Sequence, residues 1–194
     1  MKKTTLFLLL VILITLSFGQ NYRNNESIFK YGFKAGFNTP FVKDYSVVPG
    51  NWTFSGEVGF FGRIGKKYSV DIGVDVNFNK LYFNSDSPFL SSMIETKFLQ
   101  IPLRFLIEFP TYKFQKLQLS TGLLYQQLIN VSINNIGYSQ KNITKQQFIY
   151  TVGVGYSYKF VTIELNYRHF LKNFDVETTK KKQKHLNISI YVAF

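Results

Sequence analysis

The sequence predicts an all-β fold: an eight-stranded antiparallel up-and-down transmembrane β-barrel, preceded by a cleavable signal peptide. Three observations predict it. Apolar and polar residues alternate with a period of two in stretch after stretch, short and long connections alternate between these stretches, and the last stretch ends on an aromatic residue, Phe194. Alternation with a period of two gives a strand one apolar and one polar face. In a membrane barrel the apolar face meets lipid and the polar face lines the lumen.

The N-terminal segment has the pattern of a secretory signal peptide. Two lysines follow Met1, residues 6–16 are apolar, and 17–19 end in a small residue. The apolar run is shorter than the roughly 20 residues that a spanning helix needs. We therefore expect residues 1–19 to be removed and residues 20–194 to form one outer-membrane barrel domain.

The first three predicted strands show the alternation directly. Phe, Tyr and Ala alternate with Lys and Gly in 29–37, and 52–64 places Trp, Phe, Val and Ile opposite Thr, Ser, Glu and Arg. The third strand, 68–79, is the most regular, because every second residue from Tyr68 to Phe78 is apolar. The intervening residues are Ser, Asp, Gly and Asn, which favour a polar lumen over lipid.

The other five strands follow the same rule. Leu, Ile and Phe alternate with Gln, Arg and Glu in 94–109. Pro102 lies inside this strand and has no amide hydrogen to donate, so we expect a β-bulge there. Leu and Tyr face outward in 116–129, and Tyr and Val alternate with Gly and Ser in 146–158. The last two strands are predicted at 161–168 and 186–194.

The connections alternate in length. Short ones lie at 65–67, 110–115 and 159–160, whereas the segment after 37 and those at 80–93, 130–145 and 172–184 are long and polar. Outer-membrane barrels have short periplasmic turns and long extracellular loops. A soluble lipocalin-like barrel also has eight strands, but it would turn the apolar face inward. The polar face is rich in Gly and Ser, which suit a narrow lumen better than a surface in water.

Composition agrees with an exported membrane barrel. Aromatic residues make up 18% of the 194 residues, with 13 Tyr and 21 Phe, as expected where aromatic girdles mark both membrane interfaces. Cysteine is absent, which excludes disulfides and thiolate metal sites. The formal net charge is +12, and for an exported chain anionic lipid or lipopolysaccharide is a better partner than nucleic acid.

Charged residues on the polar faces are predicted to form a structural network inside the lumen. Eight strands enclose a space that side chains just fill, and charges buried there must be paired. A narrow ion path is the alternative reading. The predicted acids are Glu57, Asp71, Asp75, Glu108 and Glu164, and the predicted bases are Lys34, Arg63, Arg104, Lys159 and Arg168.

Other motifs carry little chemistry. A lipid-hydrolysing triad would need a histidine beside a serine and a carboxylate. Only His169 and His185 are present, and both are expected to be interface residues at strand ends. The last long loop carries a basic run that is either a solvated loop or a contact for lipopolysaccharide phosphates or an acidic partner. This run is Lys180, Lys181, Lys182 and Lys184.

The end of the chain and three internal segments resemble known patterns. Residues 187–194, with Val192 and Phe194, resemble the C-terminal signal read by the barrel-assembly machinery, although Ser189 stands at its usual glycine. Residues 97–105 (KFLQIPLRF) resemble a strand of the PorT-like outer-membrane β-barrel family (OMP beta-barrel domain) of Bacteroidota, with Gln100 where that family usually has Glu. The segments YGFKAGFN, at 31–38, and GVGY, at 153–156, carry the same resemblance.

The resemblance implies an integral outer-membrane barrel, and the founding member of that family is implicated in protein secretion. No catalytic or binding residues define the family. We therefore expect a non-enzymatic outer-membrane protein of a Gram-negative bacterium, accessory to secretion or envelope assembly, without cofactors. A narrow porin-like channel is the first alternative and a lipid-modifying enzyme the second. The expected partners are membrane lipid, lipopolysaccharide, the barrel-assembly machinery and an envelope or secretion protein.

Overall fold

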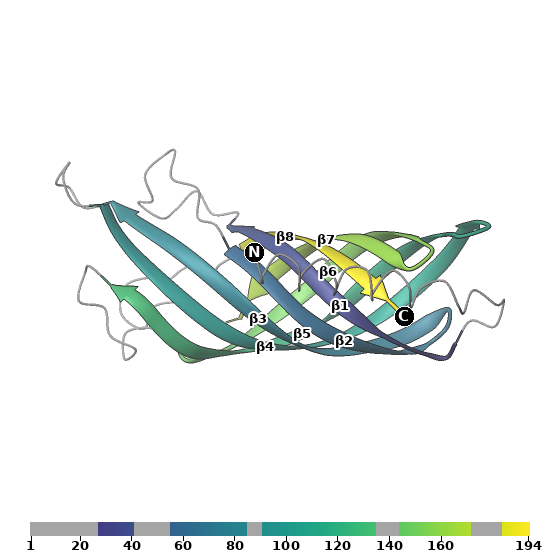
Figure 1. Ribbon diagram of the computed structural model, residues 1–194, viewed down its shortest axis with the longest axis horizontal. Coiled ribbons are helices and arrows are strands. Elements are labelled where there is room, and N and C mark those ends of the chain that lie inside the picture. Colours follow the sequence, from purple (N-terminus) through teal and green to yellow (C-terminus); the bar gives the residue numbers. More distant parts are fainter. Residues whose placement is uncertain (1–26, 41–54, 85–90, 135–143, 172–183) are drawn as a thin grey trace, which may run out of the picture.

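The computed structural model describes residues 27–40, 55–84, 91–134, 144–171 and 184–194. These residues form eight strands that pair in chain order and close into an antiparallel barrel (Figure 1). This confirms the predicted eight-stranded antiparallel barrel, whereas the predicted signal peptide, residues 1–19, lies outside the described residues. Within the described residues, no helix has the length and hydropathy needed to cross a membrane. The strands are β1 (Phe29–Pro40), β2 (Ser55–Gly65), β3 (Tyr68–Asn84), β4 (Ser91–Tyr112), β5 (Gln115–Asn134), β6 (Gln146–Tyr158), β7 (Val161–Phe170) and β8 (Lys184–Ala193).

The register of the strands defines the geometry of the barrel. Following paired residues from Phe29 around all eight strands returns to β1 at Thr39, ten residues further along the chain. At standard strand spacings this shift tilts the strands by roughly 40° from the barrel axis. The tilt brings residues from distant parts of the chain to the same height in the lumen.

The two faces of the wall have opposite chemistry. Outward-facing apolar side chains are open, with Phe60 62% and Ile72 56% exposed, whereas Glu164 and Ser189 on the inner face are 0% exposed. A water-filled lumen would leave its lining accessible, so the interior of the described barrel is closed by side chains. The outer surface is the apolar one, as the alternation predicts for a barrel in lipid.

The strands at the loop end are longer than predicted. Residues 80–93 were expected to be a loop, but β3 continues to Asn84 and β4 begins at Ser91, with pairs such as Phe83↔Ser92. The β5 strand likewise continues to Asn134, into the predicted loop 130–145. The backbones of these strands remain paired beyond the point where apolar and polar residues stop alternating. Strand ends inferred from the alternation alone were therefore placed too early along the chain. In Figure 1 these three strands reach beyond their neighbours. Predicted strand residues 52–54 lie outside the described residues.

The predicted bulge at Pro102 is wrong. Pairing with β3 keeps one register from Ile72↔Leu103 to Asp75↔Gln100, and only the two pairs between them are missing. Proline removes a donor, which interrupts the ladder without adding a residue. A Cβ on the facing Gly73 would lie 3.2 Å from the ring of Pro102, so glycine leaves room for it. The register shifts of β4 against β5 lie elsewhere, at Glu95/Thr96, Lys97/Phe98 and Pro110/Tyr112.

Candidate functional site: a filled, charge-paired lumen

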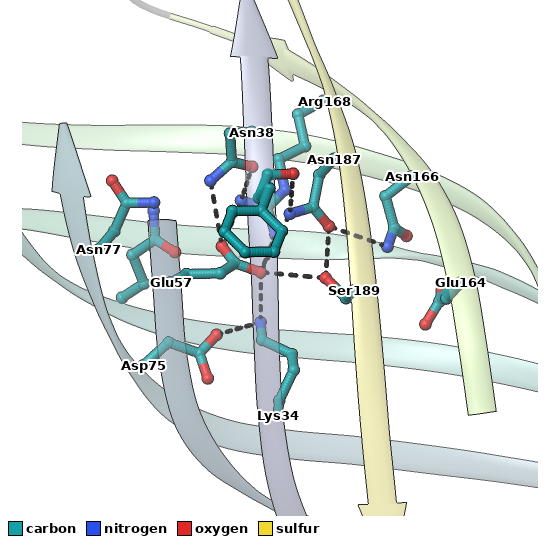
Figure 2. Close-up of polar contacts among 12 residues, drawn as sticks. Lys34, Asn38, Glu57, Asp75, Asn77, Glu164, Asn166, Arg168, Asn187 and Ser189 are labelled. Atoms are coloured by element: carbon teal, nitrogen blue, oxygen red, sulfur yellow. Dashed lines mark hydrogen bonds and ion pairs between the residues drawn. The ribbon is translucent and has the colours of Figure 1, made fainter. Parts of the chain in front are cut away.

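A first group of charges, here called the Glu57 cluster, lies on β1, β2, β3 and β7 (Figure 2). Arg168 donates to both carboxylate oxygens of Glu57, Nη1 to Oε2 at 2.7 Å and Nη2 to Oε1 at 2.9 Å. Lys34 pairs with Glu57 at 3.1 Å and also with Asp75. A two-pronged arginine–carboxylate pair fixes geometry as well as charge.

Neutral donors complete the shell of the Glu57 carboxylate. Ser189 Oγ and Asn187 Nδ2 on β8 each donate to Oε1 at 3.2 Å, and Asn38 Nδ2 on β1 reaches Oε2 at 3.5 Å. Glu57 is only 1% exposed. Because a buried carboxylate is costly unless it is paired and hydrogen-bonded, this full set of donors is what allows the charge to remain inside.

A second group, here called the Arg104 cluster, lies nearer the short turns. Its six charged members are Arg63, Asp71, Arg104, Glu108, Lys116 and Glu164. Arg104 bridges Asp71 at 2.9 Å and Glu164 at 2.8 Å. Arg63 bridges the same Asp71 at 2.7 Å and Glu108 at 2.8 Å, and Lys116 closes the chain of pairs at Glu108.

Each cluster is neutral by itself. The Glu57 cluster joins two carboxylates to two cations, and the Arg104 cluster joins three to three. Neutrality matters because the lumen excludes water, so an unbalanced charge there would be poorly screened. The arrangement holds strands together across the lumen; it leaves no charged side chain of either cluster without an opposite partner.

Apolar side chains fill the space that the clusters leave. The Tyr191 ring lies between the two clusters, 4.8 Å from Arg104 Cζ and 5.9 Å from Lys34 Nζ, and packs edge-on against Phe61. Such cation–aromatic contacts contribute about 2 kcal/mol when desolvated. Among the described residues, the buried apolar side chains of the inner face are those of Phe61, Phe98, Leu106, Leu124, Leu128, Ile149, Phe170 and Tyr191.

Sequence reasoning missed these apolar lumen residues. The sequence does contain a sign of them: two apolar residues follow each other at Phe60-Phe61 and at Leu123-Leu124. Because neighbouring side chains of a strand point to opposite faces, one residue of each pair must face the lumen. Leu124, Ile149 and Phe170 pack together as a small core.

Two cavities in the lumen each have a volume of about 10 Å³. A cavity of this size holds about one water molecule. The first is lined in part by Thr151, Asn166 and Arg168, whose Oγ1, Oδ1 and Nε atoms lack a protein partner. The second lies among carboxamides and beside His185. Neither offers space for an organic ligand.

Nine of the ten residues predicted for the lumen network, all except Lys159, lie on the lumen face and form ion pairs with one another or with Lys116. Lys159 was predicted there and is not: it lies exposed in the β6–β7 turn with a φ of 54°. Lys159 lies in the predicted connection 159–160, and because the chain reverses there, the alternation of the preceding strand does not determine which way its side chain points.

The two histidines lie on opposite faces of the wall. His185 was expected at the membrane interface, but its ring lies in the lumen, 4.7 Å from the ring of Phe170. His169 is on the outward-facing side of β7 and pairs with Lys184 across the strands. Within the described ranges, no group of three or more His, Cys, Asp or Glu residues is arranged to hold a metal ion.

The remaining predicted residues lie at the two ends of the barrel. Of the basic run, Lys184 is exposed at the start of β8, and residues 180–182 lie outside the described residues. Val192 pairs with Phe33 and Val161, and the ring of Phe194 lies 5.9 Å from those of Tyr31 and Phe33. The aromatic end of the chain therefore contributes to the outer surface beside β1.

Comparisons with known proteins agree with this architecture. A family model described as "Putative MetA-pathway of phenol degradation", of the outer-membrane barrel type, matches residues 6–179. The crystal structure of Neisserial surface protein A is 19% identical with a TM-score of 0.53, covering 87% of this chain and 98% of that one. This likeness shows the fold alone. The PorT-like assignment is a different family description and stays a prediction.

Two further structures have lower scores. The outer membrane enzyme PagL is 10% identical (TM-score 0.49; 84% of this chain, 98% of that one). Ail of Yersinia pestis in a nanodisc is 12% identical (TM-score 0.47; 85% and 99%). No curated protein sequence matches the chain.

Proposed function

Because the chain belongs to the family described as "Putative MetA-pathway of phenol degradation" and its lumen is filled, we propose that it is a non-enzymatic integral protein of the outer membrane. Its role is structural or interactive, as an accessory of secretion or envelope assembly. The observation that carries this proposal is the closed lumen: two neutral ion-pair clusters, buried except for the partly exposed Lys116, leave the outer surface and the ends of the barrel as the parts that meet partners.

Chemistry inside the barrel has little support. The family description names phenol, but cavities of about 10 Å³ are too small for an aromatic ring. A hydrolytic triad needs its serine, histidine and carboxylate in one site. His169 and His185 point to opposite faces of the wall, and His185 packs against Phe170. The Glu57 and Glu164 carboxylates are held by arginines, which suits structural ion pairs better than proton transfer.

The location and the interaction role are tested together by fractionation and co-purification. We expect a chain tagged after residue 20 to appear in the outer-membrane fraction as a folded barrel and to bring down an envelope component in fixed stoichiometry. A variant with Lys180, Lys181, Lys182 and Lys184 replaced by Gln reports whether the basic loop makes that contact. A barrel that purifies alone would contradict the interaction role, and absence from the outer membrane would contradict the location.

We also expect the purified protein to be silent in planar bilayers, because a conducting path would have to break the pairs of Arg104 with Asp71 and Glu164. The measurement is single-channel recording after insertion has been confirmed on the same sample. Discrete conductance steps that disappear when Arg104 or Glu164 is replaced would instead establish the narrow channel.

A further inference from the structure

The end of the barrel that carries the short turns has a ring of exposed cations. The turn-end lysines are Lys66 and Lys67 between β2 and β3, Lys113 between β4 and β5, and Lys159 between β6 and β7. Because consecutive strands run up and down, these three turns lie at the same end. Within the described ranges, none of the four lysines forms an ion pair with a carboxylate.

The side-chain carboxylates of the described ranges do not face this ring, and the terminal carboxylate of Phe194, on the last residue of the chain, lies at this end. Most lie in the lumen, where the two clusters hold them, and Glu95 pairs with Lys80 at the loop end. Glu108 is the buried acid nearest the turns, and it is already bound by Arg63 and Lys116. The turn end therefore carries four lysines that no described side-chain carboxylate neutralises.

Three of the four turn-end lysines lie close to aromatic rings. Lys67 Nζ lies 5.6 Å from the ring of Tyr68, and Lys159 Nζ lies 5.5 Å from that of Tyr158. Lys113 and Lys159 both lie over Phe114, at 5.7 and 5.8 Å. The Phe114 ring therefore brings the ammonium groups of two different turns to one part of the turn end.

The positions of the Tyr68 and Tyr158 rings indicate from which direction an anion would approach these lysines. Tyr68 is 58% exposed and Tyr158 50% exposed on the outward-facing wall, where aromatic residues of a barrel lie at headgroup depth. A lysine beside such a ring keeps its stem against apolar surface and its ammonium at the level of the lipid phosphates. An acidic protein approaching along the barrel axis would meet the turns but not these lateral rings.

The backbone conformation of Lys159 is an independent observation in favour of a functional lysine at this turn. Its φ of 54° lies in the left-handed region, where glycine or asparagine is accommodated at lower cost. Its backbone N–H donates to the carbonyl of Phe114 at 2.9 Å, which ties the β6–β7 turn to the β4–β5 turn. A lysine at this strained position brings a second charge to the Phe114 ring.

We propose that the turn end of the barrel binds the phosphate groups of anionic phospholipids through Lys66, Lys67, Lys113 and Lys159. The inference rests on the proposed outer-membrane location and adds a lipid class and a site to it. Each lysine near a membrane surface contributes about a five-fold increase in affinity for anionic lipid, and the contribution falls with salt.

The test uses the full barrel in phosphatidylcholine vesicles that contain a minor fraction of spin-labelled phosphatidylglycerol. Electron paramagnetic resonance reports the preference of the lipid shell for the anionic label. K67Q/K113Q/K159N is expected to lose most of the preference, and Asn suits the φ of residue 159. K67R/K113R/K159R keeps the charges and is expected to keep the preference. The matched control K97Q/K145Q/K184Q removes three exposed charges at the loop end and is expected to lose less.

Equal losses in the turn-end and loop-end variants, or no loss in either, would overturn the inference. Folding is checked on each variant by the shift in gel mobility on heating. A wild-type chain that does not insert as a barrel would refute the proposed location itself, whereas an inserted barrel without selective loss at the turn end would refute only the lipid site.

Discussion

Glu57→Gln is expected to lower the free energy of unfolding of the barrel by about 3–5 kcal/mol, because it removes one partner from a buried ion-pair group. Asp75, which pairs with Lys34, would then be the one carboxylate left beside two cations, and Arg168 would lose its partner, so the lumen would hold an uncompensated positive charge. The glutamine keeps the shape of the side chain, so loss of packing contributes little. The measurement is reversible urea unfolding of the inserted barrel.

The control for this change is Glu95→Gln. It breaks the pair of Glu95 with Lys80, in which the lysine side chain is 49% exposed, at the loop end. Pairs of this kind contribute about 0–1 kcal/mol, so the midpoint of unfolding should hardly move. Equal effects of the two substitutions would mean that the lumen pairs do not stabilise the barrel more than a surface pair does.

Gly32→Ala is expected to destabilise the barrel by about 1–3 kcal/mol or more, because the new methyl group has no room. A Cβ at Gly32 would clash with the backbone oxygen of Val192 and lie 2.9 Å from the ring of Phe61. Backbone cannot rotate away as a side chain can, so β1 and β8 would have to separate where the barrel closes. We expect a lower urea midpoint and a smaller folded fraction after refolding into vesicles.

The neighbouring Gly62 supplies a matched control. A Cβ there would meet only the Phe29 ring, at 3.8 Å, which is ordinary contact. Gly62→Ala is therefore expected to be neutral, or to stabilise by about 0.4–1 kcal/mol by restricting the unfolded chain. If both alanines behaved alike, the tight closure between β1 and β8 would not be a constraint on the fold.

The sequence was sufficient for the fold class and for the side of the wall on which most residues lie. A period of two assigns every residue of a strand to one face once a single residue is assigned. Glu57, Asp71, Arg104 and Glu164 could therefore be placed in the lumen without knowing any pairing. The alternation of apolar and polar residues depends only on neighbouring positions in the chain, so it can be recognised in the sequence without knowing how the strands pair.

The alternation of apolar and polar residues gave wrong predictions where the pairing between strands determined the structure. Strands β3, β4 and β5 extend past the regular alternation because backbone hydrogen bonds continue between them. Pro102 interrupts a ladder without a bulge because the facing Gly73 accommodates its ring. Lys159 leaves the lumen because the chain turns at that residue.

What the sequence by itself determined is the set of residues that face inward; what only the tertiary structure decided is which of them meet. Arg168 and Glu57 are separated by 111 residues and join because the ten-residue shift around the barrel brings β7 and β2 to the same height. The same register divides the charges into two neutral clusters with Tyr191 between them. Register is a property of the closed barrel, and no single strand contains it.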